Sequence, residues 1–127
     1  MKVLSIKQPW ASLIVRGIKN IENRTWKCPD KYIGQRILVH ASSVPDKRPQ
    51  ELFSEKQAEI VDDYFLETLM SYDNTSAIVG SVIIEKCVQN HPSVWAEKGV
   101  WNWVLKDAEF FHHPIKDVKG KLGFWDY

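Results

Sequence analysis

The distribution of apolar residues along the chain predicts mostly β-structure. The most apolar run, residues 77–88, is short and rich in β-branched residues, which favours a buried central strand over a helix. Apolar residues that alternate with polar ones predict further strands at residues 2–6, 20–26, 36–41, 101–105, 110–115 and 122–125. A turn near Asp107 is expected to join the two strands on either side of it.

Apolar residues at helical spacing predict one short and one long helix. Pro9 suits the first turn of the short helix, where its missing N–H group is not needed, and Gly17 suits the end. The long helix is expected over residues 49–72, and its apolar stripe consists of Phe53, Ile60, Val61, Tyr64, Phe65 and Leu69. Ser54 and Gln57 have the spacing of a capping box, so the first turn can form a separate piece.

These elements together predict an α+β fold. Five to seven strands are expected to form a mixed, mostly antiparallel sheet that curls into a small barrel, with the helices flanking it. The strands follow one another too closely for repeated βαβ units. With 127 residues, the chain is long enough for one domain with a proper core, and residues 1–127 are read as that single domain.

Composition indicates an ordinary globular protein, with 44% apolar and 26% charged residues. Cys28 and Cys87 are far apart in the sequence and belong to no CxxC or Cys/His pattern, which is typical of reduced thiols in an intracellular protein. The chain contains no apolar run of the length of a signal peptide or a membrane span. We therefore expect a cytoplasmic protein without a membrane partner.

The net charge is only +1, but the charges are unevenly distributed. Residues 1–41 contain eight Lys and Arg against two acids, residues 42–77 contain three against eight, and the remainder is balanced at six each. A basic first third can attract phosphate locally while an acidic region limits nonspecific coating of nucleic acid. The alternative is an ordinary acidic surface opposite an ordinary basic one.

Lys19, Glu22 and Arg24 form the most informative constellation of polar residues. Glu22 and Arg24 share one face of the predicted strand, together with Trp26, and the preceding turn can bring Lys19 over them. A carboxylate held between two cations stays ionised and can accept hydrogen bonds from a nucleobase, while the cations bind phosphate. The alternative is a surface ion-pair cluster, which contributes only about 0–1 kcal/mol per pair.

Gln8, Trp10 and Ser12 lie at the start of the predicted short helix, where unbonded N–H groups favour anions. Trp10 can be either a stacking surface or a core residue. The chain has six tryptophans, of which we expect three or four in the core and one or two at a ligand site.

No complete catalytic or metal-binding set is recognisable. His40, followed by Ser42 and Ser43, lacks an orienting acid and a nucleophile elbow, so a structural role is favoured. His112 and His113 are adjacent on a strand and point to opposite faces, which is poor geometry for one metal ion. We predict no cofactor and no metal.

The segment over residues 5–26, SIKQPWASLIVRGIKNIENRTW, resembles the opening signature of the ASCH domain family. The combination of QPWAS with GxKxxExR is specific. Later segments are also similar to family blocks: VHAS at 39–42, AIVGSV at 77–82, GVWNWVL at 99–105, PI at 114–115 and GKLGFW at 120–125. The region at about 46–74 is covered least and looks like a variable helical insert.

The resemblance implies a PUA-like β-barrel and a cleft suited to RNA or a modified nucleobase. The matched motif residues are Lys19, Glu22 and Arg24, with Gln8, Trp10 and Ser12 as neighbours. Some similar proteins are amidohydrolases that deacetylate N4-acetylcytidine with a lysine, a threonine in the same motif and a distant glutamate. Here Lys19 is kept, but Glu22 stands where those enzymes have the threonine. This departure removes the nucleophile, so that activity is not transferred, whereas another branch of the family has been described as ribonucleases.

The leading hypothesis is a module that binds RNA or a nucleotide derived from it. Trp10 or Trp26 would stack on the base, Glu22 would accept from its edge, and Lys19 and Arg24 would hold phosphate or sugar. A second hypothesis is a hydrolase with Lys19 and Glu22 in acid–base roles. A third is a protein-interaction module whose basic face docks an acidic partner. The sequence leaves open whether the chain is an enzyme.

Overall fold

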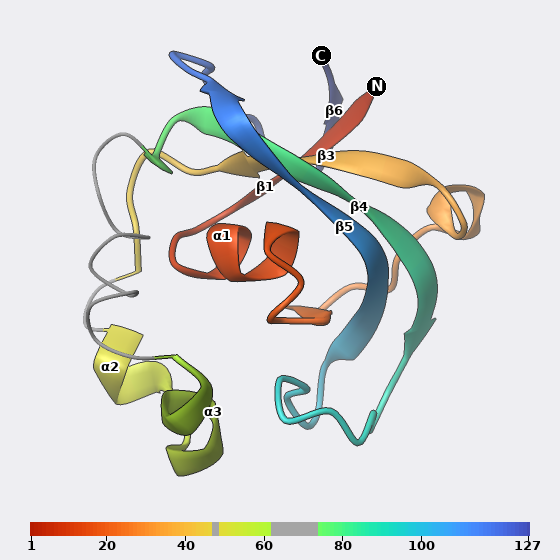
Figure 1. Ribbon diagram of the computed structural model, residues 1–127. Coiled ribbons are helices and arrows are strands. Elements are labelled where there is room, and N and C mark those ends of the chain that lie inside the picture. Colours follow the sequence, from red (N-terminus) through yellow and green to blue (C-terminus); the bar gives the residue numbers. More distant parts are fainter. Residues whose placement is uncertain (47–48, 62–73) are drawn as a thin grey trace.

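The chain forms a curled six-stranded sheet with short helices (Figure 1). The computed structural model describes residues 1–46, 49–61 and 74–127. In chain order the elements are β1 (Lys2–Ile6), α1 (Trp10–Val15), β2 (Ile21–Arg24), a 3₁₀ turn η1 (Asp30–Tyr32), β3 (Arg36–Ala41), α2 (Pro49–Leu52), α3 (Glu55–Ile60), β4 (Ala77–Val88), β5 (Trp101–Ile115) and β6 (Phe124–Asp126).

The strands are arranged in the order β2-β5-β4-β3-β1-β6. Only β1 and β3 run parallel, and the other neighbouring pairs are antiparallel. The predicted mixed, mostly antiparallel sheet is therefore confirmed. β2 and β6 are the two edges of the sheet, and the chain ends lie together beside β1 and β6, where the Tyr127 N–H group donates to the Met1 carbonyl.

Helix α1 lies inside the curve of the sheet (Figure 1) and is buried from Ala11 to Val15. Gly80 on β4 makes this close packing possible. A Cβ atom at Gly80 would lie 2.2 Å from the Glu109 carbonyl oxygen and 2.7 Å from the Val15 Cβ, so no larger residue fits without movement of the backbone. The core forms between the sheet and this helix because β1, β3 and β4 turn their apolar residues toward it.

Two predicted element boundaries are wrong, one in β5 and one in β2. The turn expected near Asp107 is instead a bulge: Asp107 has a φ of 50°, one extra residue is accommodated between the pairs Ser81–Glu109 and Ile83–Lys106, and pairing with β4 continues on both sides. The strand predicted over 20–26 ends at Arg24, so Trp26 lies beyond it.

The predicted long helix is also wrong within the described residues. Ser54 has an extended conformation, which separates α2 from α3, and Val61 is extended again, so α3 ends at Ile60. The predicted capping box is confirmed, because Gln57 N–H donates to Ser54 Oγ and Ser54 N–H donates to Gln57 Oε1. Of the predicted stripe, Val61 is buried and Ile60 is exposed. Tyr64, Phe65 and Leu69 lie outside the described residues.

The core contains three of the six tryptophans, within the expected three or four. Trp95, Trp103 and Trp125 are buried in the core, whereas Trp10 and Trp101 are partly buried and Trp26 is 38% exposed. Cys28 and Cys87, distant in sequence, meet in space: the Cys28 N–H group lies 3.4 Å from Cys87 Sγ, and both thiols are free.

A chain of hydrogen bonds through His40 ties β6 and the segment before it to β1 and β3. The His40 Nε2 lies 2.6 Å from the Val118 carbonyl, which can only accept, so this nitrogen carries the proton. Trp125 Nε1–H donates to Ser5 Oγ, whose hydroxyl then donates to His40 Nδ1, each over 3.1 Å. Both ring nitrogens are thus engaged, which agrees with the structural role predicted for His40.

We predict that Gly80→Ala lowers the free energy of unfolding by about 1–3 kcal/mol, because the added methyl group overpacks the contact with Val15. Chemical denaturation measures this. Glu85→Ala, at an exposed position of the same strand, is the control and is expected to change stability by less than about 0.5 kcal/mol. Equal stability of Gly80→Ala and the parent protein would show that α1 does not pack tightly at this point.

A second prediction concerns acid. Burial lowers the pKa of His40, and the hydrogen bond to the Val118 carbonyl opposes this only in part. Below a pH of about 6.5 the unfolded chain therefore takes up a proton that the folded protein resists, so stability falls as the pH falls. The melting temperature should drop more steeply between about pH 7.5 and about pH 5.5 in the parent protein than in His40→Gln. If the melting temperature falls equally with pH in both proteins, His40 is not the group that causes the loss of stability, because the other titrating groups are the same in both.

Candidate functional site

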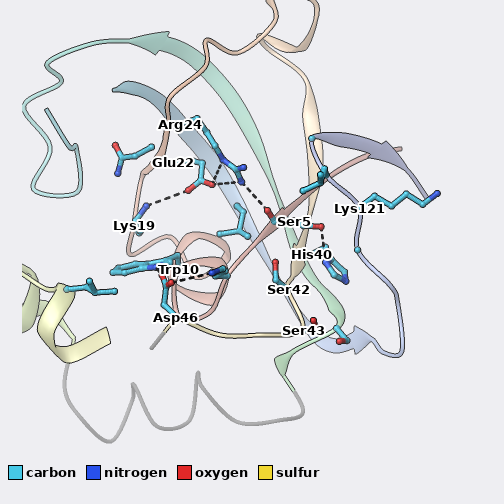
Figure 2. A pocket seen from close by; sticks show the side chains of 18 of the residues that line it. Ser5, Trp10, Lys19, Glu22, Arg24, His40, Ser42, Ser43, Asp46 and Lys121 are labelled. Atoms are coloured by element: carbon cyan, nitrogen blue, oxygen red, sulfur yellow. Dashed lines mark hydrogen bonds and ion pairs between the residues drawn. The ribbon is translucent and has the colours of Figure 1, made fainter. Parts of the chain in front are cut away.

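A cleft of about 1350 Å³ opens between the two edges of the curled sheet (Figure 2). One wall is formed by Lys19 and β2, the other by the segment that leads into β6, and Trp10 of α1 lies on the Lys19 side. The lining residues are Ser5, Ile6, Lys7, Trp10, Lys19, Glu22, Asn23, Arg24, His40, Ser42, Ser43, Asp46, Leu52, Ser54, Gln57, Ser76, Trp95, Glu97 and residues 117–123.

Lys19, Glu22 and Arg24 come together in this cleft, as predicted from their spacing. The Arg24 Nε and Nη2 atoms lie 2.9 Å and 2.8 Å from Glu22 Oε2, and Lys19 Nζ lies 3.9 Å from Glu22 Oε1. β2 pairs with β5 so that Glu22 stands opposite the fully buried Trp103, which fixes its backbone. The carboxylate is thereby held between two cations.

Arg24 has a second partner on the opposite edge of the sheet. Its Nη2 donates to the Ser5 carbonyl over 3.0 Å. Strand β6 pairs with β1 only as far as Leu4, so Arg24 takes up the carbonyl one residue further along β1. The guanidinium therefore connects β1 to β2 across the open side of the sheet.

Lys19 and Glu22 are both buried, at 6% and 7% exposure. Burial lowers the pKa of Lys19, and the nearby Glu22 carboxylate opposes this shift. The Lys19 ammonium also donates to the Ile21 carbonyl. Because an unpaired buried charge is strongly destabilising, each of the two residues depends on the other.

Trp10 is fixed at the side of this cluster. Its Nε1–H donates to the Asp46 carboxylate, its ring meets Phe53 edge-on at a centroid distance of 5.3 Å, and Lys19 Nζ lies 5.7 Å from its centroid. The indole is partly buried and lines the cleft, so it serves as both core residue and cleft wall.

Gln8 and Ser12, which we expected beside a ligand, are placed beneath the cleft and do not line it. Gln8 Oε1 accepts from Ser12 N–H at 3.0 Å, and Gln8 Nε2 donates to Ser12 Oγ at 2.7 Å. Gln8 thus uses the start of α1 for its own hydrogen bonds. The expected anion site at this helix end is not formed.

Trp26 is placed outside the cleft. Because β2 ends at Arg24, Trp26 does not share its strand face, and this prediction is wrong. Its ring packs edge-on against Trp103 and Phe124, with centroid distances of 4.8 Å and 6.1 Å.

Several lining residues were not identified from the sequence. Trp95 and Glu97 come from the loop between β4 and β5, and nothing in their local pattern connects them with Glu22. The segment before β6 does carry a signal, because Lys119 and Lys121 alternate with glycines just ahead of an aromatic strand. Ser42 and Ser43 also line the cleft, beside the engaged His40 (Figure 2).

The described part of the chain contains no group of three or more His, Cys, Asp and Glu side chains arranged to hold a metal ion. Over the same residues, every helix is too short or too polar to cross a bilayer.

Comparison with solved structures agrees on the fold. The ASCH protein of Zymomonas mobilis superposes with a TM-score of 0.55 at 18% identity, over 91% of this chain and 72% of that chain. A serine-to-alanine variant of it gives a TM-score of 0.53 at 18% identity, over 91% and 73%. The curled six-stranded sheet with its short helices is thus the PUA-like α+β fold that we predicted.

Sequence comparison agrees on the family. The chain is 47% identical over 55 residues to activating signal cointegrator 1 of Homo sapiens, and equally to that of Mus musculus. The match covers 43% of this chain but only 9% of those much longer relatives. The profile of the ASCH domain matches residues 4–112, which is most of the chain. The chain therefore belongs to the ASCH domain family.

Proposed function

We propose that this ASCH domain binds RNA, or a nucleotide derived from it, in the cleft. The observation that carries the proposal is the buried Glu22 carboxylate, held between Lys19 and Arg24 at the wall of a large open cleft. The ASCH resemblance, which implies a cleft for RNA or a modified nucleobase, supports the same class of ligand.

The chemistry of Glu22 selects the part of the ligand that it contacts. An ionised carboxylate repels phosphate because both groups are negatively charged. It only accepts hydrogen bonds, so its partners are the N–H groups of a base edge. Arg24 occupies Oε2, whereas Oε1 lies 3.9 Å from Lys19 Nζ, which leaves Oε1 to accept from a ligand. Because Arg24 already orients the carboxylate, little ordering is required on binding.

The cleft also contains groups suited to the rest of a nucleotide. Lys7 and Lys119 line it and supply positive charge for phosphate, in addition to Lys19 and Arg24. Trp10 offers an indole beside Glu22. Stacking contributes roughly 1–3 kcal/mol per base, so we expect micromolar affinity that falls with added salt.

A specific observation favours hydrolysis as a second candidate. Proton transfer by a lysine requires a pKa below its ordinary value, and burial shifts the pKa of Lys19 in that direction beside a carboxylate. In this reading Lys19 and Glu22 would act as acid and base on RNA or on a modified nucleoside.

Binding is tested by fluorescence anisotropy with short labelled RNAs. Glu22→Gln keeps the shape but removes the charge, and we expect an affinity about 10- to 100-fold lower. Glu109→Gln, an exposed carboxylate outside the cleft, is the matched control and should bind like the parent protein. Circular dichroism establishes that the variants are folded. Unchanged affinity in the double variant Lys19→Ala, Glu22→Ala would reject this site.

Hydrolysis is tested by incubating the protein with labelled RNA and following new products by gel electrophoresis. If the second candidate holds, cleavage is expected in the parent protein and is lost in folded Glu22→Gln. RNA that binds but stays intact would leave a binding module. If a pulldown instead captures a protein, and neither nuclease treatment nor Glu22→Gln reduces this capture, the interaction-module hypothesis is favoured over both.

A further inference from the structure

Leu122 stands apart from the other apolar residues that the structure describes. Its side chain is 99% exposed, whereas the next most exposed large apolar residue is Met1 at 60%. Leu122 nevertheless belongs to the cleft wall and is flanked by Lys119, Lys121 and two glycines. A single exposed leucine is ordinary, but this one lies beside a candidate ligand site.

The backbone that carries Leu122 is anchored at both ends. Val118 N–H donates to the Ser76 carbonyl at 2.9 Å, and the Val118 carbonyl accepts from His40. Gly120 lies so close to His40 and Ser5 that a Cβ atom would be 2.7 Å and 2.8 Å from their nearest atoms. β6 then pairs with β1 directly after the segment. The exposed leucine is therefore presented from a fixed position.

Lys121 reaches out of the cleft. In Figure 2 its side chain extends away from Glu22 and from the cleft. A phosphate attached to the nucleotide at Glu22 would lie inside the cleft, whereas a phosphate near the Lys121 ammonium would belong to a neighbouring nucleotide. This placement favours a polynucleotide over a free nucleotide.

We propose that the loop Lys119–Gly123 adapts the cleft to single-stranded RNA. This inference rests on the proposed function. Leu122 packs against the face of the base that follows the one at Glu22, as apolar side chains do between bases elsewhere. Lys119 and Lys121 pair with the phosphates on either side. The strand is single in this arrangement, because Glu22 is buried at 7% exposure and an RNA duplex presents its bases in a major groove too deep and narrow for a side chain to read.

An anionic lipid surface is the other partner that suits a leucine between lysines. The cleft beside Leu122 speaks against it. A flat layer of anionic headgroups would contact Leu122 and Lys121 from outside and would leave Glu22 and the other groups inside the cleft without a partner. Unpaired bases carry donors for such groups, so nucleic acid is favoured.

The test compares an oligonucleotide with mononucleotides. A fluorescein-labelled RNA octamer of random sequence is titrated by anisotropy, and an equimolar mixture of the four nucleoside 5′-monophosphates is used as competitor. Leu122→Ser is expected to weaken octamer binding about 5- to 10-fold and to change mononucleotide affinity less than about 2-fold. Leu122→Phe should bind the octamer at least as well as the parent protein. Val44→Ser, at a 59% exposed position outside the cleft, is the matched control.

Salt dependence tests the two lysines. Lys119→Ala and Lys121→Ala are each expected to reduce the slope of log affinity against log salt by about 0.7, the value for one phosphate contact on a single strand.

The outcomes separate this inference from the function on which it rests. If Leu122→Ser binds the octamer like the parent while Glu22→Gln does not bind, the loop proposal is overturned and the cleft proposal stands. If Leu122→Ser weakens the affinity for the octamer and for the mononucleotides equally, the loop proposal is also overturned, because Leu122 then only shapes the cleft. Leu122-dependent binding to phosphatidylserine vesicles without octamer binding would assign the loop to membranes. If the parent protein binds neither RNA nor mononucleotides, the proposed function fails as well.

Discussion

The side chain of Arg24 connects the two ends of a sheet that the backbone leaves open. Strand β2 lies at one edge of the sheet, and β1 with the short β6 lies at the other. Arg24 donates to the Ser5 carbonyl on β1 and to the Glu22 carboxylate on its own strand. This guanidinium therefore spans the open side of the sheet beside the cleft. The side chain that orients Glu22 is therefore also the one that connects β2 to β1.

The interior of the curl is filled by α1, and this requires a position without a side chain on β4. Gly80 allows the close approach to Val15. With α1 seated, Trp10 stands at the cleft and the following turn carries Lys19 to Glu22. Core packing and the polar cluster thus arise from one short segment of the chain. A buried cation and carboxylate are maintained here at an energetic cost that an ordinary core would avoid.

Local patterns predicted most of this fold and the centre of the site. Alternation located the strands, and the GxKxxExR spacing predicted that Lys19, Glu22 and Arg24 meet. The errors arose where distant partners decide. The Asp107 bulge is maintained by continuous pairing with β4, and the expected anion site at α1 is taken up by Gln8. Trp95 reaches the cleft only through the way the chain folds, which no local pattern reveals.

Closure by a side chain instead of a backbone ladder has a mechanical consequence. Separating two paired strands breaks several backbone hydrogen bonds together, whereas the seam at Ser5 can part by a change of rotamer at one arginine. The hydrogen bond between the two edges can therefore be lost without breaking a backbone pair among β3, β4 and β5. Loss of this contact would leave the hydrophobic packing around α1 intact.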